Sequence, residues 1–193
     1  MNCCGSTTRT ESPFRMGSGI PKQFLEINGK PILIHTLQLF QHHHEIDKIY
    51  AAVQEDYISY VEDLADEYRV TKLAAVVAGG ETAQDSIYNA LKRAESENPA
   101  DSIVLIHDGA RPFVTSRMIE ESIDTAKQYG ACTVGMPVKD TIKIVDEEGY
   151  GIETPDRRRL WQIQTPQTFS VPLILQAHEQ MKQAGDTMVT DDT

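Results

Sequence analysis

Two cations, Arg15 and Lys22, stand close together in the segment RMGSGIPKQF. Small residues separate them, and Pro21 directly precedes the lysine. Such a loop can lie over a triphosphate, because cations neutralise phosphate oxygens and small residues let the backbone approach. The segment therefore predicts a nucleotide-phosphate site that uses Arg15 and Lys22 as its positive charges.

A second polar group, HDGARP, directly follows the apolar run SIVLI. A carboxylate next to glycine at the end of a strand suits a Mg²⁺ ligand or a ribose contact, which makes Asp108 a candidate. Arg111 can bind a phosphate through parallel N–H donors. The alternative is an Asp–Arg pair that only ties down a loop, but such dense packing of polar types favours a functional role.

A glycine pair, Gly79 and Gly80, ends another apolar run, KLAAVVA, and a polar stretch leads on to Ser86. Glycines after a strand let backbone N–H groups approach a ligand, and the next helix offers its positive end. Taken by itself, this stretch somewhat favours an ordinary strand-to-helix turn.

A third polar group flanks the acidic, glycine-bearing turn of residues 146–150, which predicts a hairpin. The two ends of that hairpin would bring the Thr141 hydroxyl beside the Arg157 guanidinium, forming a reasonable phosphate site. Arg158 and Arg159 are interpreted as solvated surface charges.

Three consecutive histidines, His42, His43 and His44, suggest a metal site at first sight. Adjacent residues on a helix point in different directions, however, so they chelate a single ion poorly. We interpret the run as a frayed, solvated helix end.

Apolar strands alternate with amphipathic helices along the chain, which predicts an α/β fold with a mostly parallel sheet covered on both faces. Parallel strands end at a common edge, where ligands bind. The hairpin of residues 141–145 and 151–154 should leave the sheet, and residues 161–165 should return to it. Ser116 is expected to cap one helix and Gly130 to end it. The expected strands are 48–53, 72–78, 102–106 and 131–136, and the expected helices are 31–43, 56–68, 82–93, 116–129 and 171–183.

The composition sets outer bounds on function. The 193 residues favour one domain, and 18 basic against 29 acidic residues give a net charge of −11. That charge disfavours nucleic acids and anionic membranes as partners. We see no apolar run of roughly 18 residues, no secretory signal and no disulfide framework in three cysteines. A cytoplasmic location is expected, with a plastid as the alternative if the source is a plant or alga.

Taken together and in order, these groups resemble the 2-C-methyl-D-erythritol 4-phosphate cytidylyltransferase family of the non-mevalonate isoprenoid pathway. Several separated motifs in the same order are more specific than any one of them. The resemblance runs from residue 15 to about residue 192 and rests on RM with PKQ, GG with DSI, HDGARP, PVKDT, DR with LW, and TPQ.

The resemblance implies a Rossmann-like nucleotidyltransferase that joins CTP to methylerythritol phosphate with Mg²⁺ and releases pyrophosphate. It also implies a homodimer in which the arm of residues 138–158 reaches the partner's site. Arg15, Lys22 and Arg157 would be catalytic; Asp108, Arg111 and Thr141 would bind the alcohol; Gly79, Gly80 and Ser86 would bind the nucleotide; and Asp108 would be the metal ligand.

The chain also departs from the family pattern. Residues 1–14 show no period and are expected to form a loop instead of the family's first strand and glycine-rich loop. Glu11 would place an anion near the phosphates, and Ala83 stands where the family often has arginine. We expect a single domain over residues 1–193 in which the family's last strand, last helix and a substrate-phosphate lysine are missing. A pentitol-phosphate cytidylyltransferase, such as one for ribitol phosphate, and a truncated non-catalytic relative are the alternatives.

Overall fold

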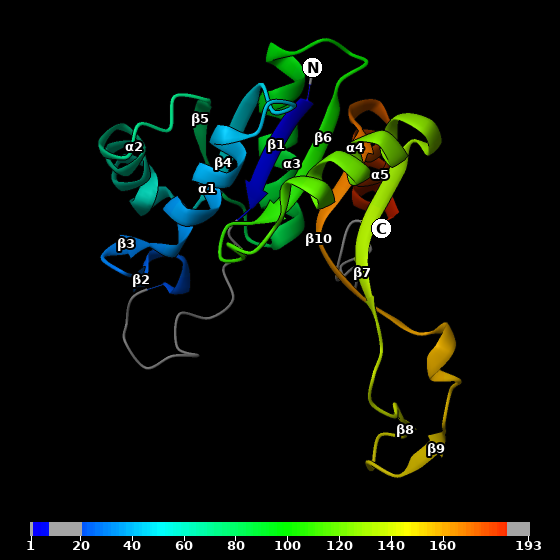
Figure 1. The fold of residues 1–193 in the computed structure, drawn as a ribbon. Coiled ribbons are helices and arrows are strands. Elements are labelled where there is room, and N and C mark those ends of the chain that lie inside the picture. The colour runs from blue at the N-terminus through cyan, green and yellow to red at the C-terminus, as the bar shows by residue number, and fades with distance from the viewer. Residues whose placement is uncertain (1, 8–20, 185–193) are drawn as a thin grey trace.

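A six-stranded sheet in the order β5-β4-β1-β6-β10-β7 forms the centre of the molecule (Figure 1). The computed structural model describes residues 2–7, by their backbone, and residues 21–184. Strands β5, β4, β1 and β6 are parallel, and β10 is antiparallel to its neighbours β6 and β7, so the predicted mostly parallel sheet is confirmed. The strands are β1 Asn2–Thr7, β4 Lys48–Val53, β5 Leu73–Ala78, β6 Ile103–Asp108, β7 Ala131–Pro137 and β10 Trp161–Ser170.

The N-terminal strand corrects the sequence prediction. β1 lies between β4 and β6, with Cys3 opposite Lys48 and Thr7 opposite Asp108. The expectation of a loop, and of a missing first strand, is therefore wrong for residues 2–7. The run NCCGST carries no apolar period, and its place comes from two parallel neighbours that satisfy its backbone groups on both sides. The remainder of the predicted loop, residues 8–14, lies outside the described residues.

Helices cover both faces of the sheet, as predicted. One apolar core joins α1, α2 and α4 to Leu105 of β6, and a second joins α3 and α5 to Val104 and Ile106. Alternate residues of β6 thus face opposite helical layers. The helices are α1 Ile32–His42, α2 Ile58–Glu67, α3 Ala83–Glu97, α4 Ser116–Tyr129 and α5 Val171–Ala184, with short 3-10 turns η1 Lys22–Phe24, η2 Glu55–Tyr57 and η3 Arg157–Arg159 and a small pair of strands, β2 Glu26–Ile27 and β3 Lys30–Pro31.

The ends of α4 follow the predicted chemistry with a shift of one residue. The cap is Thr115, whose hydroxyl accepts a hydrogen bond from the Met118 N–H, so the prediction of Ser116 is wrong. Gly130 ends the helix with a φ of 88°, a left-handed conformation that glycine adopts without strain.

A two-stranded hairpin stands apart from the main sheet (Figure 1). Its strands, β8 Ile144–Val145 and β9 Gly151–Glu153, pair antiparallel within the region where the sequence predicted a hairpin. We call residues 138–158 the arm. β10 then returns to the sheet and runs on to Ser170, past the predicted limit of residue 165, because its far half pairs with β6. Among the described helices, none is long and apolar enough to span a bilayer.

Candidate active site

The main cluster of charged side chains lies where β6 ends. Asp108 is the last residue of β6, and its side chain is 17% exposed. Its Oδ2 atom lies 3.8 Å from Lys22 Nζ and 3.4 Å from Arg111 Nε, while its Oδ1 accepts a hydrogen bond from the Ala110 N–H. The structure thus brings together three predicted site residues around one carboxylate.

Arg111 is also held from the neighbouring strand. One of its guanidinium nitrogens, Nη1, donates to Gln164 Oε1 of β10, and the adjacent Thr165 hydroxyl accepts a bond from the Asp108 N–H at 3.3 Å. Sequence reasoning missed Gln164 as a site residue, because only the pairing of β10 with β6 brings Gln164 to the loop that carries Arg111. The nearby TPQ motif was the available signal.

The loop after β6 rests on a buried histidine. His107 is 1% exposed, and its Nε2 lies 3.0 Å from the Arg111 carbonyl, to which a neutral ring donates. Burial lowers the pKa of His107 to about 4, so the ring is neutral near pH 7. From the other side, the Thr36 hydroxyl donates to the Gly109 carbonyl at 2.8 Å. These contacts fix the backbone that carries Asp108 and Arg111.

The glycine pair is required by close packing against α3. A Cβ atom on Gly80 would lie 2.2 Å from Asp85 Cβ, and one on Gly79 would lie 2.9 Å from Ser86 Oγ. The buried Ser86 hydroxyl accepts from the Gly80 N–H and donates to the Thr82 carbonyl, each at 3.0 Å. Ser86 therefore shapes the turn, and its predicted contact with a nucleotide stays a prediction.

The positive end of α3 already holds a carboxylate. Asp85 accepts from the Thr82 N–H and hydroxyl, and the side-chain bond with Thr82 is the main reason that the pKa of Asp85 is lowered. Ala83 supplies no charge at this end. A phosphate near this turn would therefore depend on the backbone N–H groups of the glycine turn more than on the N-terminus of α3, which Asp85 occupies.

The predicted arm residues lie away from this cluster. Arg157 Nη1 donates to the Lys139 carbonyl at 2.9 Å, which joins the two ends of the arm two residues before Thr141. Thr141 and Arg157 are both exposed, and the arm extends away from the end of β6 in Figure 1. Arg158 instead pairs with Asp156 at 2.7 Å, in keeping with a surface charge.

Arg15 lies outside the described residues. Thr7 pairs with Asp108 in the sheet, and the described chain resumes at Pro21, next to Lys22. The described residues that flank this segment, Thr7 and Pro21, therefore lie at the edge where Lys22, Asp108 and Arg111 meet.

Asp108 fits poorly as a Mg²⁺ ligand in this arrangement. Its carboxylate already faces the cations of Lys22 and Arg111, and a third positive charge would repel both. Its other oxygen is engaged with backbone. A carboxylate paired in this way is suited to holding the two cations in place.

A parallel sheet whose carboxyl edge combines a glycine turn with converging cations defines the class: an α/β nucleotidyltransferase. The chain matches the family model described as IspD: 2-C-methyl-D-erythritol 4-phosphate cytidylyltransferase over residues 11–193. It belongs to that family.

Individual relatives agree with this assignment. A 2-C-methyl-D-erythritol 4-phosphate cytidylyltransferase from Clostridium botulinum is 48% identical over 179 residues, covering 93% of this chain and 76% of the relative. One from Bacillus mycoides is 46% identical over 170 residues, covering 88% and 73%. The crystal structure of the Anaerococcus prevotii 4-diphosphocytidyl-2C-methyl-D-erythritol synthase superposes with a TM-score of 0.83 at 30% identity, covering 100% of this chain and 79% of that one.

Proposed function

We propose that this chain transfers a cytidylyl group from CTP to 2-C-methyl-D-erythritol 4-phosphate, giving the CDP-alcohol and pyrophosphate for isoprenoid precursor synthesis. Family membership and the names of the relatives support these substrates. The observation that carries the chemistry is the convergence of Lys22 and Arg111 on Asp108 at the carboxyl edge of the sheet.

The reaction needs charge stabilisation more than proton transfer. The substrate phosphate is already ionised and attacks the α-phosphorus of CTP, forming one P–O bond while the bond to the leaving pyrophosphate breaks. Two anions must approach each other, and negative charge builds up on the phosphoryl oxygens. Fixed cations stabilise that state, which is the role proposed for Lys22 and Arg15.

The other residues take binding roles in this proposal. Asp108, Arg111 and Thr141 contact the alcohol, and Arg157 positions its phosphate. Gly79 and Gly80 offer backbone to the cytidine half, and Ser86 supports the turn that they form. The hydrogen bonds of His107 and Gln164 hold Arg111 in position for its role.

Mg²⁺ is proposed as a cofactor that arrives on the triphosphate of CTP. Mg²⁺ prefers oxygen ligands and is commonly bound through substrate phosphates and a few carboxylates. It would offset the charge of the phosphates. Because Asp108 is already paired with Lys22 and Arg111, it is not assigned as a ligand of this ion, and no catalytic step is assigned to the ion.

We also propose a homodimer in which the arm completes the partner's site. Exposed apolar side chains support this, since Tyr150 is 72%, Ile152 is 66% and Trp161 is 58% exposed. The arm extends away from the main sheet (Figure 1), which supports a role for its residues Thr141 and Arg157 in the partner's site. The cytoplasmic location stays a prediction.

Pyrophosphate release tests the proposal directly. The chain is incubated with CTP, Mg²⁺ and methylerythritol phosphate, and parallel reactions contain ribitol phosphate or no acceptor. Release with methylerythritol phosphate alone is expected. Preferential release with ribitol phosphate would favour the pentitol enzyme. No release, together with no CTP binding by calorimetry, would favour a non-catalytic relative.

A further inference from the structure

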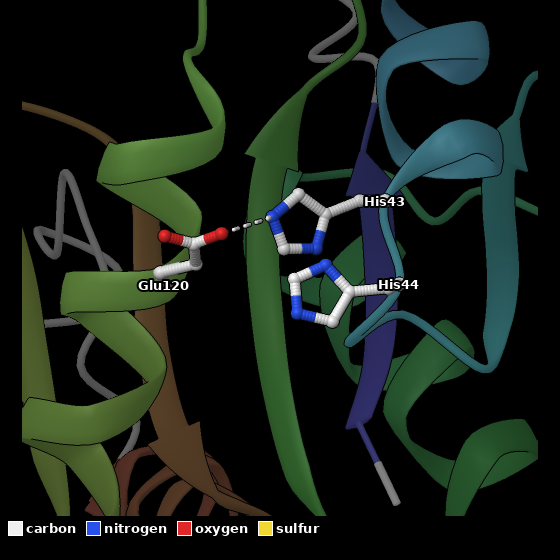
Figure 2. A group of neighbouring side chains, drawn as sticks. All are labelled: His43, His44 and Glu120. Carbon is white, nitrogen blue, oxygen red and sulfur yellow. Dashed lines mark ion pairs between the residues drawn. The ribbon is translucent and has the colours of Figure 1, made fainter.

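Three possible metal ligands gather between the end of α1 and helix α4 (Figure 2). They are His43, His44 and Glu120, and one ligand atom from each lies within 4.8 Å of the others. His43 Nε2 lies 3.7 Å from Glu120 Oε1. None of the three residues belongs to the proposed cytidylyltransferase site, so this inference stands independently of that function.

The backbone explains why two adjacent histidines can face one point. Helix α1 ends at His42, and His43 is extended, with a φ of −81° and a ψ of 130°. The rings of His43 and His44 consequently stack, with centroids 5.0 Å apart and planes 17° from parallel. The expectation that the run is a solvated helix end with diverging side chains is therefore wrong for His43, which is 5% exposed.

The buried ring of His43 has a nitrogen atom that lacks a hydrogen-bond partner among the described residues. Its Nε2 atom is buried and makes no hydrogen bond within the described residues, although it points at the Glu120 carboxylate (Figure 2). A buried polar atom without a partner is costly, and 3.7 Å exceeds hydrogen-bonding distance. A cation between the two groups would satisfy both.

Neighbouring ammonium groups do not fill this role. Lys72 Nζ donates to the His43 carbonyl at 2.7 Å, and Lys127 pairs with Glu45 at 3.5 Å. Across the described residues, the ion pair of Glu120 is with His43 alone. The carboxylate thus keeps its negative charge available on the side facing the histidines.

We propose that His43, His44 and Glu120 bind a divalent transition-metal ion of the zinc type. Imidazole nitrogens favour Zn²⁺ and its neighbours, whereas Mg²⁺ prefers oxygen. With metal–ligand distances near 2.1 Å, two ligands of one ion lie at most about 4.2 Å apart. His43 and Glu120 already meet that limit, and the more exposed side chains of His44 and Glu120 supply the remaining adjustment.

Binding also requires a proton to move. The Glu45 N–H donates to His43 Nδ1 at 3.3 Å, so a neutral His43 carries its proton on Nε2. An ion at Nε2 requires the other neutral tautomer, in which Nε2 has lost its proton to water and Nδ1 has taken one up, so this long hydrogen bond is lost. Two histidines and one carboxylate leave a fourth position for water, and the bound ion would join the end of α1 to α4.

The test uses the full chain, stripped of metal, with Zn²⁺ as the probe. Calorimetry should find one site per chain. At about a hundred times the dissociation constant, Zn²⁺ should raise the melting temperature by roughly 5–10 °C. Millimolar Mg²⁺ without CTP should neither raise the melting temperature nor displace Zn²⁺. Co²⁺ should give the visible absorption of a site with nitrogen ligands.

The variants His44→Ala and Glu120→Gln change the less buried ligands, so both should fold. Each should weaken Zn²⁺ binding at least about tenfold. Matched controls are His42→Ala, an exposed histidine bonded to the Gln38 carbonyl, and Glu121→Gln, which pairs with Arg117 on the same helix. Both controls should bind normally. The proposal is overturned by no binding in the parent chain, by unchanged binding in the ligand variants, or by equal losses in the controls.

Discussion

The predicted site residues at the edge of the sheet differ from those on the arm in their exposure and in their contacts. At the edge, Asp108 is 17% exposed and has contacts to Lys22, Arg111 and backbone. On the arm, Thr141 and Arg157 are exposed, and the hydrogen bond from Arg157 to the Lys139 carbonyl stays within the arm. The edge is thus organised by contacts within its own chain, whereas the arm residues act on the partner's site only under the homodimer proposal.

The largest expected effect tests the edge. Lys22→Ala should lower turnover about 10²–10³-fold, because it removes a fixed cation from the charge-rich transition state. Substrate binding should change much less, which is measured by comparing kcat with KM and with CTP affinity. An unchanged turnover would remove Lys22 from the chemistry.

The arm is tested by mixing two inactive variants. If Arg157 acts in the partner's site, then Lys22→Ala and Arg157→Ala dimers, once mixed and exchanged, should recover about a quarter of parent activity. Half of the exchanged dimers would carry one intact site of two. No recovery would place both residues in the same subunit's site. Arg158→Ala serves as the control and should retain full activity, since Arg158 pairs with Asp156.

Glycine-to-alanine substitutions test whether the edge of the sheet is packed more tightly than the arm. Gly80→Ala should lower the free energy of unfolding by about 2 kcal/mol, because the new Cβ meets Asp85. Gly151→Ala, on the arm, should be nearly neutral, since its nearest neighbour is Lys143 Cδ at 3.8 Å. Chemical denaturation measures both, and equal losses would contradict the contrast in packing.

The smallest effect concerns pH and His107. Its native pKa of about 4 lies below that of an unfolded histidine, so the unfolded chain binds more protons between these values. Its stabilising contribution is complete above the unfolded pKa and is lost as pH falls toward about 4. Lowering the pH from 7.5 to 5.5 should cost about 1 kcal/mol through this group. Chemical denaturation at the two pH values measures this loss of unfolding free energy. The loss should disappear in His107→Gln, which still offers an N–H, and it should persist in His42→Ala.

Sequence patterns predicted elements that bury their own apolar residues. The boundaries of β4, Lys48–Val53, were predicted without error because its run of apolar residues is fully committed to the core. β1 was missed because its small residues depend on neighbours far along the chain. The periodicity of apolar residues reveals a segment that buries its own side chains, but it does not reveal a strand that is held by its neighbours.

The site was predictable where strand ends converge and unpredictable where contacts cross the sheet. Lys22, Asp108 and Arg111 were identified from local motifs, and the structure brings them together. Gln164 and Thr165 reach this site only through the antiparallel pairing of β10 with β6. The stacking of His43 and His44 was missed because it depends on where α1 ends.

The central position of β1 sets an order for assembly on the ribosome. Its two partners, β4 and β6, are both made later, and the second ends at Asp108. At about 5–20 residues per second, β1 waits roughly 5–20 s before its second neighbour is synthesised. β1 is therefore enclosed well after it is translated, and closure of the sheet depends on contacts of high sequence separation.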